Sequence, residues 1–584
     1  MKNYQDLVNK FYSLTFSLQL RSIFIKIVAF ALFIATFLIN MAWFGSTGTN
    51  FFSRAVGTIA STLIVPALFM IIASPLTSMA IASLYFKSRQ AKNSNFGHTG
   101  SSEEATLSER MRFTPFRKVL TAGALALSIL VGSFSYIAMV PPSAIAFKPS
   151  RLTIEKVDDS ENAWVEYNLA IQDMLDFPMV ASKTADKSVQ EIIGDLSIKQ
   201  MSNPGYVGLE KVALEEEKFN EKQLSYLDKH QATFKHLIAG SKLSKSQFTS
   251  EMPTFTTRVP NLLQMRGLSI VASAQVQRLI SEGKTQEAVE LALANYEMAT
   301  DVGAEPNASL IASLISVVCR GIAAKSLFTI IYSQATDAKM DIEIARQISA
   351  QDRRMPNAFQ ALSVDLQASQ NSFEDILLNN NLSKFNNDIS PVPVAAENLA
   401  KYFPGLRVRI YNSLIDITQN CLKQLQPGLE NWDFQALEEF NKEMESKVFQ
   451  NVYDPATYIA ANLVYISLPS GAATMKSFYN SNNMGQSLTA FAAISAYKKN
   501  HNQFPATLEM AMSEAGLSTP VDLATGKQIG YRLENANSII WFAGADGQDN
   551  GGQTPYTIEE RVSSIAGKDL IFKYGEIPFH KKGQ

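Results

Sequence analysis

The chain has 584 residues, which is enough for several domains. It carries 52 Lys and Arg against 54 Asp and Glu, but residues 1–144 hold 12 of the basic and only 4 of the acidic residues. The N-terminal part is therefore basic and the remainder acidic, which argues against nucleic acid as the main partner, because phosphate binding needs clustered Lys and Arg on the binding domain.

Three apolar segments, 27–44, 55–86 and 119–140, predict a membrane domain over residues 1–148. The last of them has 22 residues without a charge, and about 20 apolar residues cross a hydrocarbon core of roughly 30 Å. The second is longer than one straight span and contains two prolines, so we expect a tilted or kinked helix there. No comparable apolar run follows, and we expect the rest of the chain to lie in water.

The Lys and Arg counts beside these segments predict the orientation. The N-terminal tail has four, the first connection has one and the loop 87–118 has seven. By the positive-inside rule the tail and this loop are cytoplasmic. The C-terminal domain then faces outward, so the predicted location is a bacterial inner membrane with a large periplasmic domain.

Residues 149–480 predict an extracytoplasmic α-helical domain, because apolar residues recur there at helical spacing. Gly283 ends one predicted helix, Gly303 and Pro306 end the next, and a third begins near Asn307 or Ser309. Further helices are predicted at 356–378, 406–426, 433–447 and 455–479. Of the two cysteines, Cys319 lies in an apolar run, which favours a buried free thiol, while its pairing with Cys421 stays open.

Residues 484–584 predict a small C-terminal α+β module. A helix at 484–500 precedes short stretches, 530–533 and 538–543, that are rich in β-branched and aromatic residues and bounded by turn residues. The predicted fold class is therefore mainly α, with three N-terminal transmembrane helices, a large periplasmic helical domain and this small module.

The C-terminal module resembles the C-terminal half of the type II secretion major pseudopilin over about 70 residues. The residues that carry the resemblance are Tyr497, Phe504, Pro505, Thr507, Leu508, Pro520, Asp522, Gly526, Lys527, Tyr531, Arg532, Gly544, Ala545, Asp546 and Gly547. The soluble part also resembles uncharacterised bacterial membrane-anchored helical proteins that end in this way. The chain lacks the cleavage site and single N-terminal helix of a pseudopilin, so we expect no processing or polymerisation of that kind.

The resemblance also implies a calcium site in the loop after 544, with Asp546 and Asp549 as the metal ligands. Oxygen-only coordination suits Ca²⁺. Two Asp in a Gly-rich loop also form turns through their own side-chain hydrogen bonds. The later acidic ligands of the pseudopilin are not in place, so a structural turn and a calcium site both stay open.

No catalytic motif of the nucleotide-binding, zinc-protease or nucleophile-elbow kind occurs. The first hypothesis is a non-enzymatic interaction or scaffold protein of a secretion- or pilus-like envelope assembly, with the lipid bilayer and other envelope proteins as partners. The alternative is an envelope hydrolase that acts on peptidoglycan or a related periplasmic polymer through a carboxylate pair. A calcium-dependent sensor is a third hypothesis.

Overall fold

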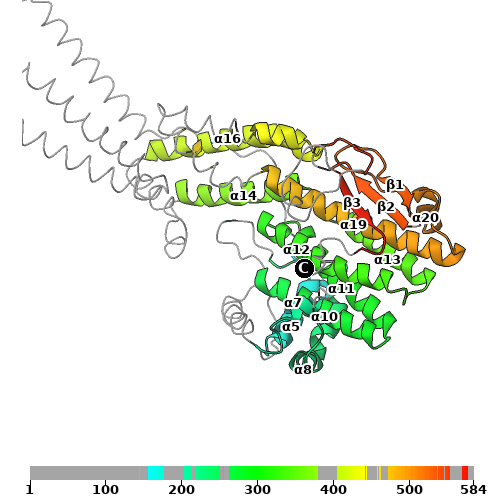
Figure 1. Cartoon of the computed structure of the whole chain (residues 1–584). Coiled ribbons are helices and arrows are strands. Elements are labelled where there is room, and N and C mark those ends of the chain that lie inside the picture. The colour runs from blue at the N-terminus through cyan, green and yellow to red at the C-terminus, as the bar shows by residue number, and fades with distance from the viewer. Residues whose placement is uncertain are drawn as a thin grey trace, which may run out of the picture. The chain divides into compact units, whose positions relative to one another are not determined.

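The computed structural model describes residues 155–176, 203–213, 217–249, 262–378, 404–440, 471–552 except 536 and 545, and 569–576, with a few isolated positions. These residues are mainly α-helical, and a small antiparallel sheet of three strands lies near the C-terminus (Figure 1). The predicted membrane spans at 27–44, 55–86 and 119–140 lie outside the described residues.

Thirteen helices and three strands make up the described part of the chain. In order they are η1 (Asp159–Glu161), α5 (Ala163–Met174), α7 (Leu209–Ala213), α8 (Glu221–Lys229), α9 (Gln231–Ser241), α10 (Leu262–Ser281), α11 (Thr285–Ala304), α12 (Leu310–Tyr332), α13 (Ala338–Asp352), α14 (Ala358–Leu377), α16 (Pro404–Glu430), α19 (Gly471–His501), α20 (Leu508–Glu514), β1 (Gly530–Glu534), β2 (Asn537–Phe542) and β3 (Leu570–Lys573).

Side-chain caps fix the start of several helices. Ser309 accepts a hydrogen bond from the backbone N–H of Ala312 at the start of α12, and Asp337 does the same for Met340 at the start of α13. Such caps satisfy backbone donors that have no partner inside the helix. The break predicted between Gly303 and Ser309 is confirmed, because α11 ends at Ala304 and α12 begins at Leu310.

Helices α10, α11 and α12 pack on one another and form the centre of the helical body. Small side chains at their contacts allow close approach, and Ala288 and Ala292 of α11 are both fully buried. Helix α12 is also the one described helix whose length and apolar character alone would suit a membrane span, although the expectation was that no such run follows residue 140. Of its most apolar window, 56% is buried inside the molecule, as in a core helix.

The cysteines lie in this body. Cys319 on α12 is a buried free thiol, as predicted, and burial raises its pKa to about 12. No disulfide links it to Cys421, which is also buried. Neither position therefore contributes a covalent crosslink to the stability of the fold.

Helix α19 joins the helical body to the sheet. It packs on α12 and α13 and, near its C-terminal end, on α20 (Figure 1). The helix predicted at 484–500 is in fact the second half of this 31-residue helix, which begins at Gly471. Phe491 of α19 contacts the rings of Phe328 on α12 and Tyr574 after β3, with centroids 6.3 and 5.8 Å apart.

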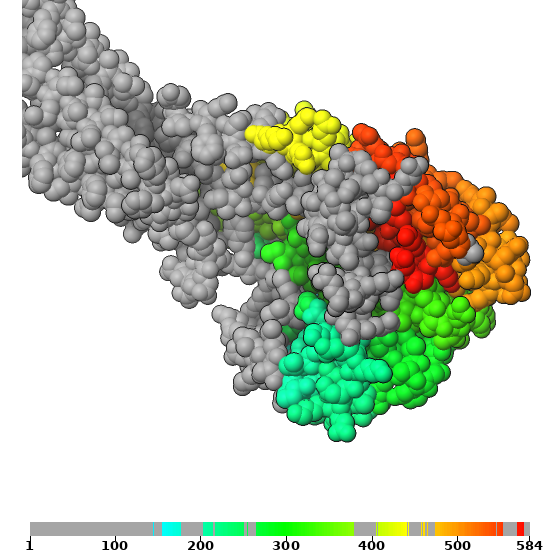
Figure 2. Space-filling view, viewed as in Figure 1, coloured from blue at the N-terminus to red at the C-terminus, as the bar shows by residue number. Residues whose placement is uncertain are grey.

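The sheet has the order β1-β2-β3 and is antiparallel throughout. The predicted hairpin is confirmed, since Tyr531 on β1 pairs with Ile540 on β2. Ile540 and Phe572, a register pair on β2 and β3, belong to the same hydrophobic cluster as the helices. Figure 2 shows α20 and the sheet, in orange and red, against the green helices of the body. Residues 144–375 and 409–584 form one compact unit, to which both belong.

Candidate functional site

A cleft of about 780 Å³ opens between α14, α16 and the segment that follows α11. Each of the two helices lines it with one stripe of side chains, spaced by three or four residues so that they share a face. The stripe of α14 consists of Phe359, Gln360, Ser363, Val364 and Gln367, and that of α16 consists of Gln419, Leu422, Lys423 and Gln426. The volume lies within the range of about 300–1,000 Å³ that is usual for ligand sites.

The turn between α11 and α12 forms the third wall of the cleft. Gly303 is required in the last turn of α11, because a Cβ there would lie 2.6 Å from Oγ of Ser316 on α12. Glu305 and Pro306 follow and line the cleft directly. The close packing of α11 on α12 therefore sets the position of this wall.

Glu305 is a buried carboxyl group at the wall of the cleft. Its Oε1 accepts hydrogen bonds from the backbone N–H groups of Phe248 at 2.5 Å and Thr249 at 3.4 Å. Burial raises its pKa to about 8, and the nearby Asp301 adds to the effect. Because burial disfavours the charged form, Glu305 is mostly protonated at neutral pH and can donate a proton.

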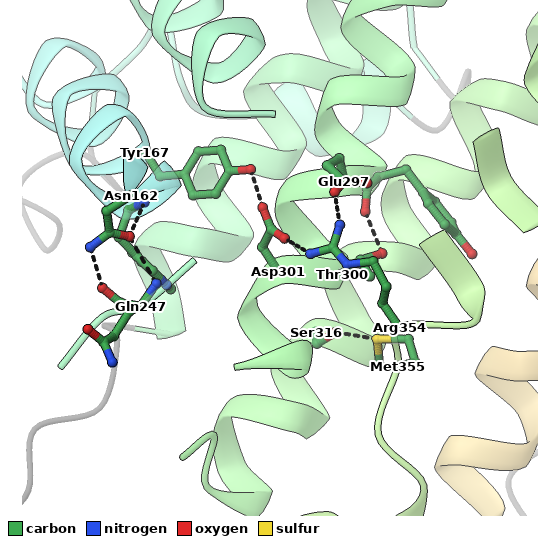
Figure 3. Close-up of polar contacts among 11 residues, drawn as sticks. Asn162, Tyr167, Gln247, Glu297, Thr300, Asp301, Ser316, Arg354 and Met355 are labelled. Atoms are coloured by element: carbon green, nitrogen blue, oxygen red, sulfur yellow. Dashed lines mark hydrogen bonds and ion pairs between the residues drawn. The ribbon is translucent and has the colours of Figure 1, made fainter. Parts of the chain in front are cut away.

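Arg354 also lines the cleft, and a network of ion pairs holds its guanidinium (Figure 3). Its two terminal nitrogens donate to Oε1 of Glu297 and to Oδ1 of Asp301, both on α11. The hydroxyl of Tyr167, on α5, donates to the second oxygen of Asp301 at 2.6 Å. Burial raises the pKa of Asp301 to about 6, while Arg354 and Tyr167 oppose this rise.

Two residues of the cleft, Gln367 and Lys423, have polar side-chain groups that a ligand could bind. Gln367 is 5% exposed, and its Nε2 has no hydrogen-bond partner among the residues that the structure describes. Lys423 is exposed and lines the cleft with a positively charged side chain. A buried donor without a partner is uncommon in native proteins, and a ligand oxygen would satisfy it. The cleft thus combines apolar walls and amide donors with the charges of Lys423 and of the ion-paired Arg354.

The sequence predicted neither the cleft nor its residues, although it predicted the helices that form the cleft. The predicted helices 356–378 and 406–426 correspond to α14 and α16. A signal was present in the sequence, since Gln recurs at a spacing of seven residues in both helices, at 360 and 367 and at 419 and 426. Two turns of helix separate such residues, so each pair lies on one face.

The predicted metal ligands Asp546 and Asp549 lie in the turn after β2, away from the residues that line the cleft. Oδ1 of Asp546 accepts the backbone N–H of Gln548 at 3.1 Å. Oδ1 of Asp549 accepts Nε1–H of Trp541 and the backbone N–H of Gly551, both at 2.8 Å. The two bonds to backbone N–H groups, each two residues further along the chain, are those expected of a structural turn.

The sequence missed a third carboxylate near this turn. Asp569 accepts backbone N–H groups from Asn550 at 3.1 Å and Gly552 at 2.6 Å, and its pKa is raised mainly by burial and also by Asp549. Within the described residues, no group of three or more acidic, His or Cys side chains is arranged to hold a metal ion. This falls short of the six to eight oxygens that Ca²⁺ takes, so the calcium site stays a prediction.

Three further residues of the pseudopilin resemblance make hydrogen bonds between segments that are distant in sequence. The hydroxyl of Tyr531 donates to the carbonyl of Pro505 at 2.7 Å. The buried carboxylate of Asp522 accepts hydrogen bonds from the hydroxyl of Tyr479 at 2.9 Å and from the backbone N–H of Ala543 at 2.7 Å. Tyr479 precedes the predicted module, so Asp522 joins the module to the first half of α19.

No family model matches the chain, and neither a curated protein nor a solved structure matches it. The function is therefore argued from the geometry of the chain itself.

Proposed function

We propose that this chain is a membrane-anchored interaction protein of the bacterial envelope that holds a segment of a partner protein in the cleft between α14 and α16. In this proposal the N-terminal spans tether the chain to the inner membrane and the helical body lies in the periplasm. The observation that carries the proposal is a cleft of about 780 Å³ whose wall contains the buried amide of Gln367.

The lining favours an extended polypeptide as the occupant. Phe359, Val364 and Leu422 offer apolar contacts to side chains. Nε2 of Gln367 needs an acceptor, which a main-chain carbonyl of an extended segment supplies, because such a segment has unpaired backbone groups. Lys423 adds a preference for an acidic residue nearby.

The resemblance of residues 484–584 to the major pseudopilin supports a secretion- or pilus-like assembly as the setting. In this proposal the C-terminal module is a second contact surface for envelope proteins. The bilayer is the other partner, through the apolar segments at 27–44, 55–86 and 119–140.

Photocrosslinking in living cells tests the cleft. A photoreactive amino acid placed at Gln419 or Gln426 is expected to yield one discrete adduct with a partner protein. The same amino acid at Lys235, an exposed position on α9 outside the cleft, is the matched control and is expected to yield none. The change Gln367→Leu is expected to weaken the adduct at Gln426. Equal adducts at all three positions, or none in the cleft, would contradict the proposal.

Protease digestion of spheroplasts tests the topology. If the proposal is right, protease added from outside removes the C-terminal domain. If that domain survives until the cells are lysed, the chain is not anchored as proposed.

A second candidate function, the envelope hydrolase, is favoured by Glu305. A carboxyl group that is protonated at neutral pH at the wall of a cleft can act as a general acid. It is the one carboxyl among the described residues that line the cleft, whereas the hypothesis from the sequence requires two. Release of soluble fragments from purified peptidoglycan, abolished by Glu305→Gln, would support this candidate, and no release by the wild-type chain would end it.

A further inference from the structure

Two small cavities lie side by side where α13 ends against α19, and both are lined by Asp352 and Asn482. Each has a volume of about 220 Å³. Arg320 and Trp432 line the first, and Gln486 and Thr489 line the second. The first cavity shares Pro356 with the cleft described above, but none of the six residues named here lines that cleft.

Four of these six side chains have a buried polar atom without a partner among the described residues. They are Nε of Arg320, Nδ2 of Asn482, Oε1 of Gln486 and Oγ1 of Thr489. Arg320 is 2% exposed and Thr489 is 4% exposed, so bulk water does not satisfy them. Native proteins pair nearly all such atoms with protein, ordered water or a ligand. An occupant of both cavities must therefore offer acceptors to two nitrogens and a donor to the oxygen of Gln486.

Charge in the first cavity is largely balanced. Arg320 donates to Asp352 through one terminal nitrogen, which also donates to the hydroxyl of Tyr296 at 2.6 Å. That hydroxyl donates to Asp352 at 2.7 Å, and the other terminal nitrogen of Arg320 donates to Ser481 at 3.0 Å. In the second cavity Arg353 lies in the lining together with Asp352, so each cavity has one Arg and one Asp in its wall. The pairing favours a neutral, hydrogen-bonding occupant.

Trp432 gives the first cavity an aromatic wall. Its backbone φ is +56°, in the left-handed region, which is unusual for a bulky residue. Such conformations occur preferentially at ligand and active sites, where the surrounding structure holds them. The ring lies beside that of Tyr479, with centroids 5.9 Å apart. The indole ring therefore gives an apolar wall to a cavity in which Arg320 and Asn482 have polar atoms without a partner among the described residues.

From these contacts we propose that Asp352, Asn482, Gln486 and Trp432 form a binding site for a saccharide. A sugar hydroxyl is both a donor and an acceptor, so a ring of hydroxyls can satisfy donors and acceptors together. The C–H face of a sugar ring packs on an indole, whose face carries partial negative charge. Each cavity, at about 220 Å³, has room for one sugar ring. This site is independent of the partner-binding cleft and would stand if that proposal failed.

Titration calorimetry and tryptophan fluorescence on the full-length chain in lipid nanodiscs test the proposal. Three probes separate the sources of a saccharide: maltose as a neutral sugar, N,N′-diacetylchitobiose as an amino sugar and glucuronic acid as an acidic one. We expect at least one probe to bind and to change the fluorescence. The change Gln486→Leu removes the buried acceptor oxygen and is expected to weaken binding about tenfold or more.

Variants at position 432 must tolerate the positive φ of that residue. Asn accepts a positive φ, so Trp432→Asn removes the ring with little strain and is expected to abolish binding. Trp432→Phe retains an aromatic wall and is expected to restore most of it. Trp541→Phe, on β2 and outside both cavities, is the matched control and should bind as the wild type does.

Melting curves accompany each variant, so that a loss of fold is distinguished from a loss of binding. Heat and fluorescence that do not change with any of the three probes would mean that the cavities hold water only and would overturn the proposal. Binding that Trp432→Asn and Gln486→Leu both leave unchanged in folded protein would place the saccharide elsewhere and overturn it as well.

Discussion

Two ion-pair clusters meet at the C-terminal end of α13, and they differ in exposure, because the side chain of Arg354 is 37% exposed and that of Arg320 is 2% exposed. In the cluster of Arg354, both terminal nitrogens have a carboxylate partner, and Tyr167 bonds the second oxygen of Asp301. In the cluster of Arg320, by contrast, Nε has no partner in the described part of the chain, and neither has Nδ2 of Asn482.

The difference decides what can satisfy the remaining polar atoms. The cluster of Arg354 joins α5 and α11 to the residues after α13, and its exposed guanidinium can also bond water or an occupant of the cleft. The cluster of Arg320 has buried donors that cost free energy unless something bonds them.

Removal of Arg320 is expected to give the largest effect. Because Arg320 is 2% exposed, Arg320→Met leaves the buried Asp352 without its countercharge, and we expect a loss of about 3–5 kcal/mol in the free energy of unfolding. Urea denaturation followed by circular dichroism measures it. The double variant Arg320→Met/Asp352→Leu should recover part of the loss, and a double variant as unstable as the single one would contradict this account.

Two helical glycines are expected to respond to alanine in opposite directions. A Cβ on Gly485 of α19 would collide with the carboxylate of Asp352, so Gly485→Ala should destabilise the fold by about 1–3 kcal/mol. Gly321 of α12 has only the flexible end of Met484 nearby, at 3.5 Å, so Gly321→Ala should be neutral or stabilise by up to about 1 kcal/mol through helix propensity. Thermal melts of both variants check the contrast. Equal losses would mean that the approach of α19 to Asp352 is not specific.

Glu305 is expected to make stability depend on pH. Its pKa in the folded state, about 8, lies above its ordinary value of 4.5, so the folded chain binds more protons than the unfolded chain between these values. The stabilisation is complete below pH 4.5 and is lost as the pH rises through 8, by about 2 kcal/mol between pH 6 and pH 8.

The variant Glu305→Gln isolates this contribution, because its amide oxygen can still accept from Phe248 and Thr249. Melting temperatures of the wild type and the variant should diverge between pH 6 and pH 8, with the variant the more stable at pH 8. Asp365, whose pKa burial raises to about 6, is common to both chains and cancels in the difference, whereas Asp301 acts on Glu305 and is part of the contribution that is measured. Parallel curves would show that Glu305 stays charged.

Gln367 is expected to give the smallest change in stability. Its Nε2 has no partner among the described residues, so Gln367→Leu removes an unsatisfied donor at nearly constant volume, and the free energy of unfolding should change by less than about 0.5 kcal/mol. Denaturant titration measures it. A large loss would mean that the amide is held by the fold and is not kept for a ligand.

The sequence predicts the helices well because their signals are local. The helical spacing of apolar residues, Gly283 and the turn before Ser309 give α10 to α12 almost as they occur. The start of α19 was not predicted, because the polar residues Ser481 to Asn483 indicated a boundary between two elements. All three lie inside the helix, where Ser481 and Asn483 are buried against other helices.

The sites depend on contacts that have no local signal. Asp352 and Asn482 are 130 positions apart in sequence, and only the packing of α13 on α19 brings them together. The same holds for Asp549 and Asp569 in the C-terminal module, where only the first was predicted. The Asp546 and Asp549 loop remains a prediction as a calcium site, and the hydrogen bonds in it are those of a turn.

Helix α19 has a mechanical consequence. At about 1.5 Å per residue, its 31 residues form a rod of roughly 46 Å that starts among the body helices and ends beside α20. No break interrupts it, and it packs on α12, α13 and α20, so one continuous helix spans the helical body and the C-terminal module.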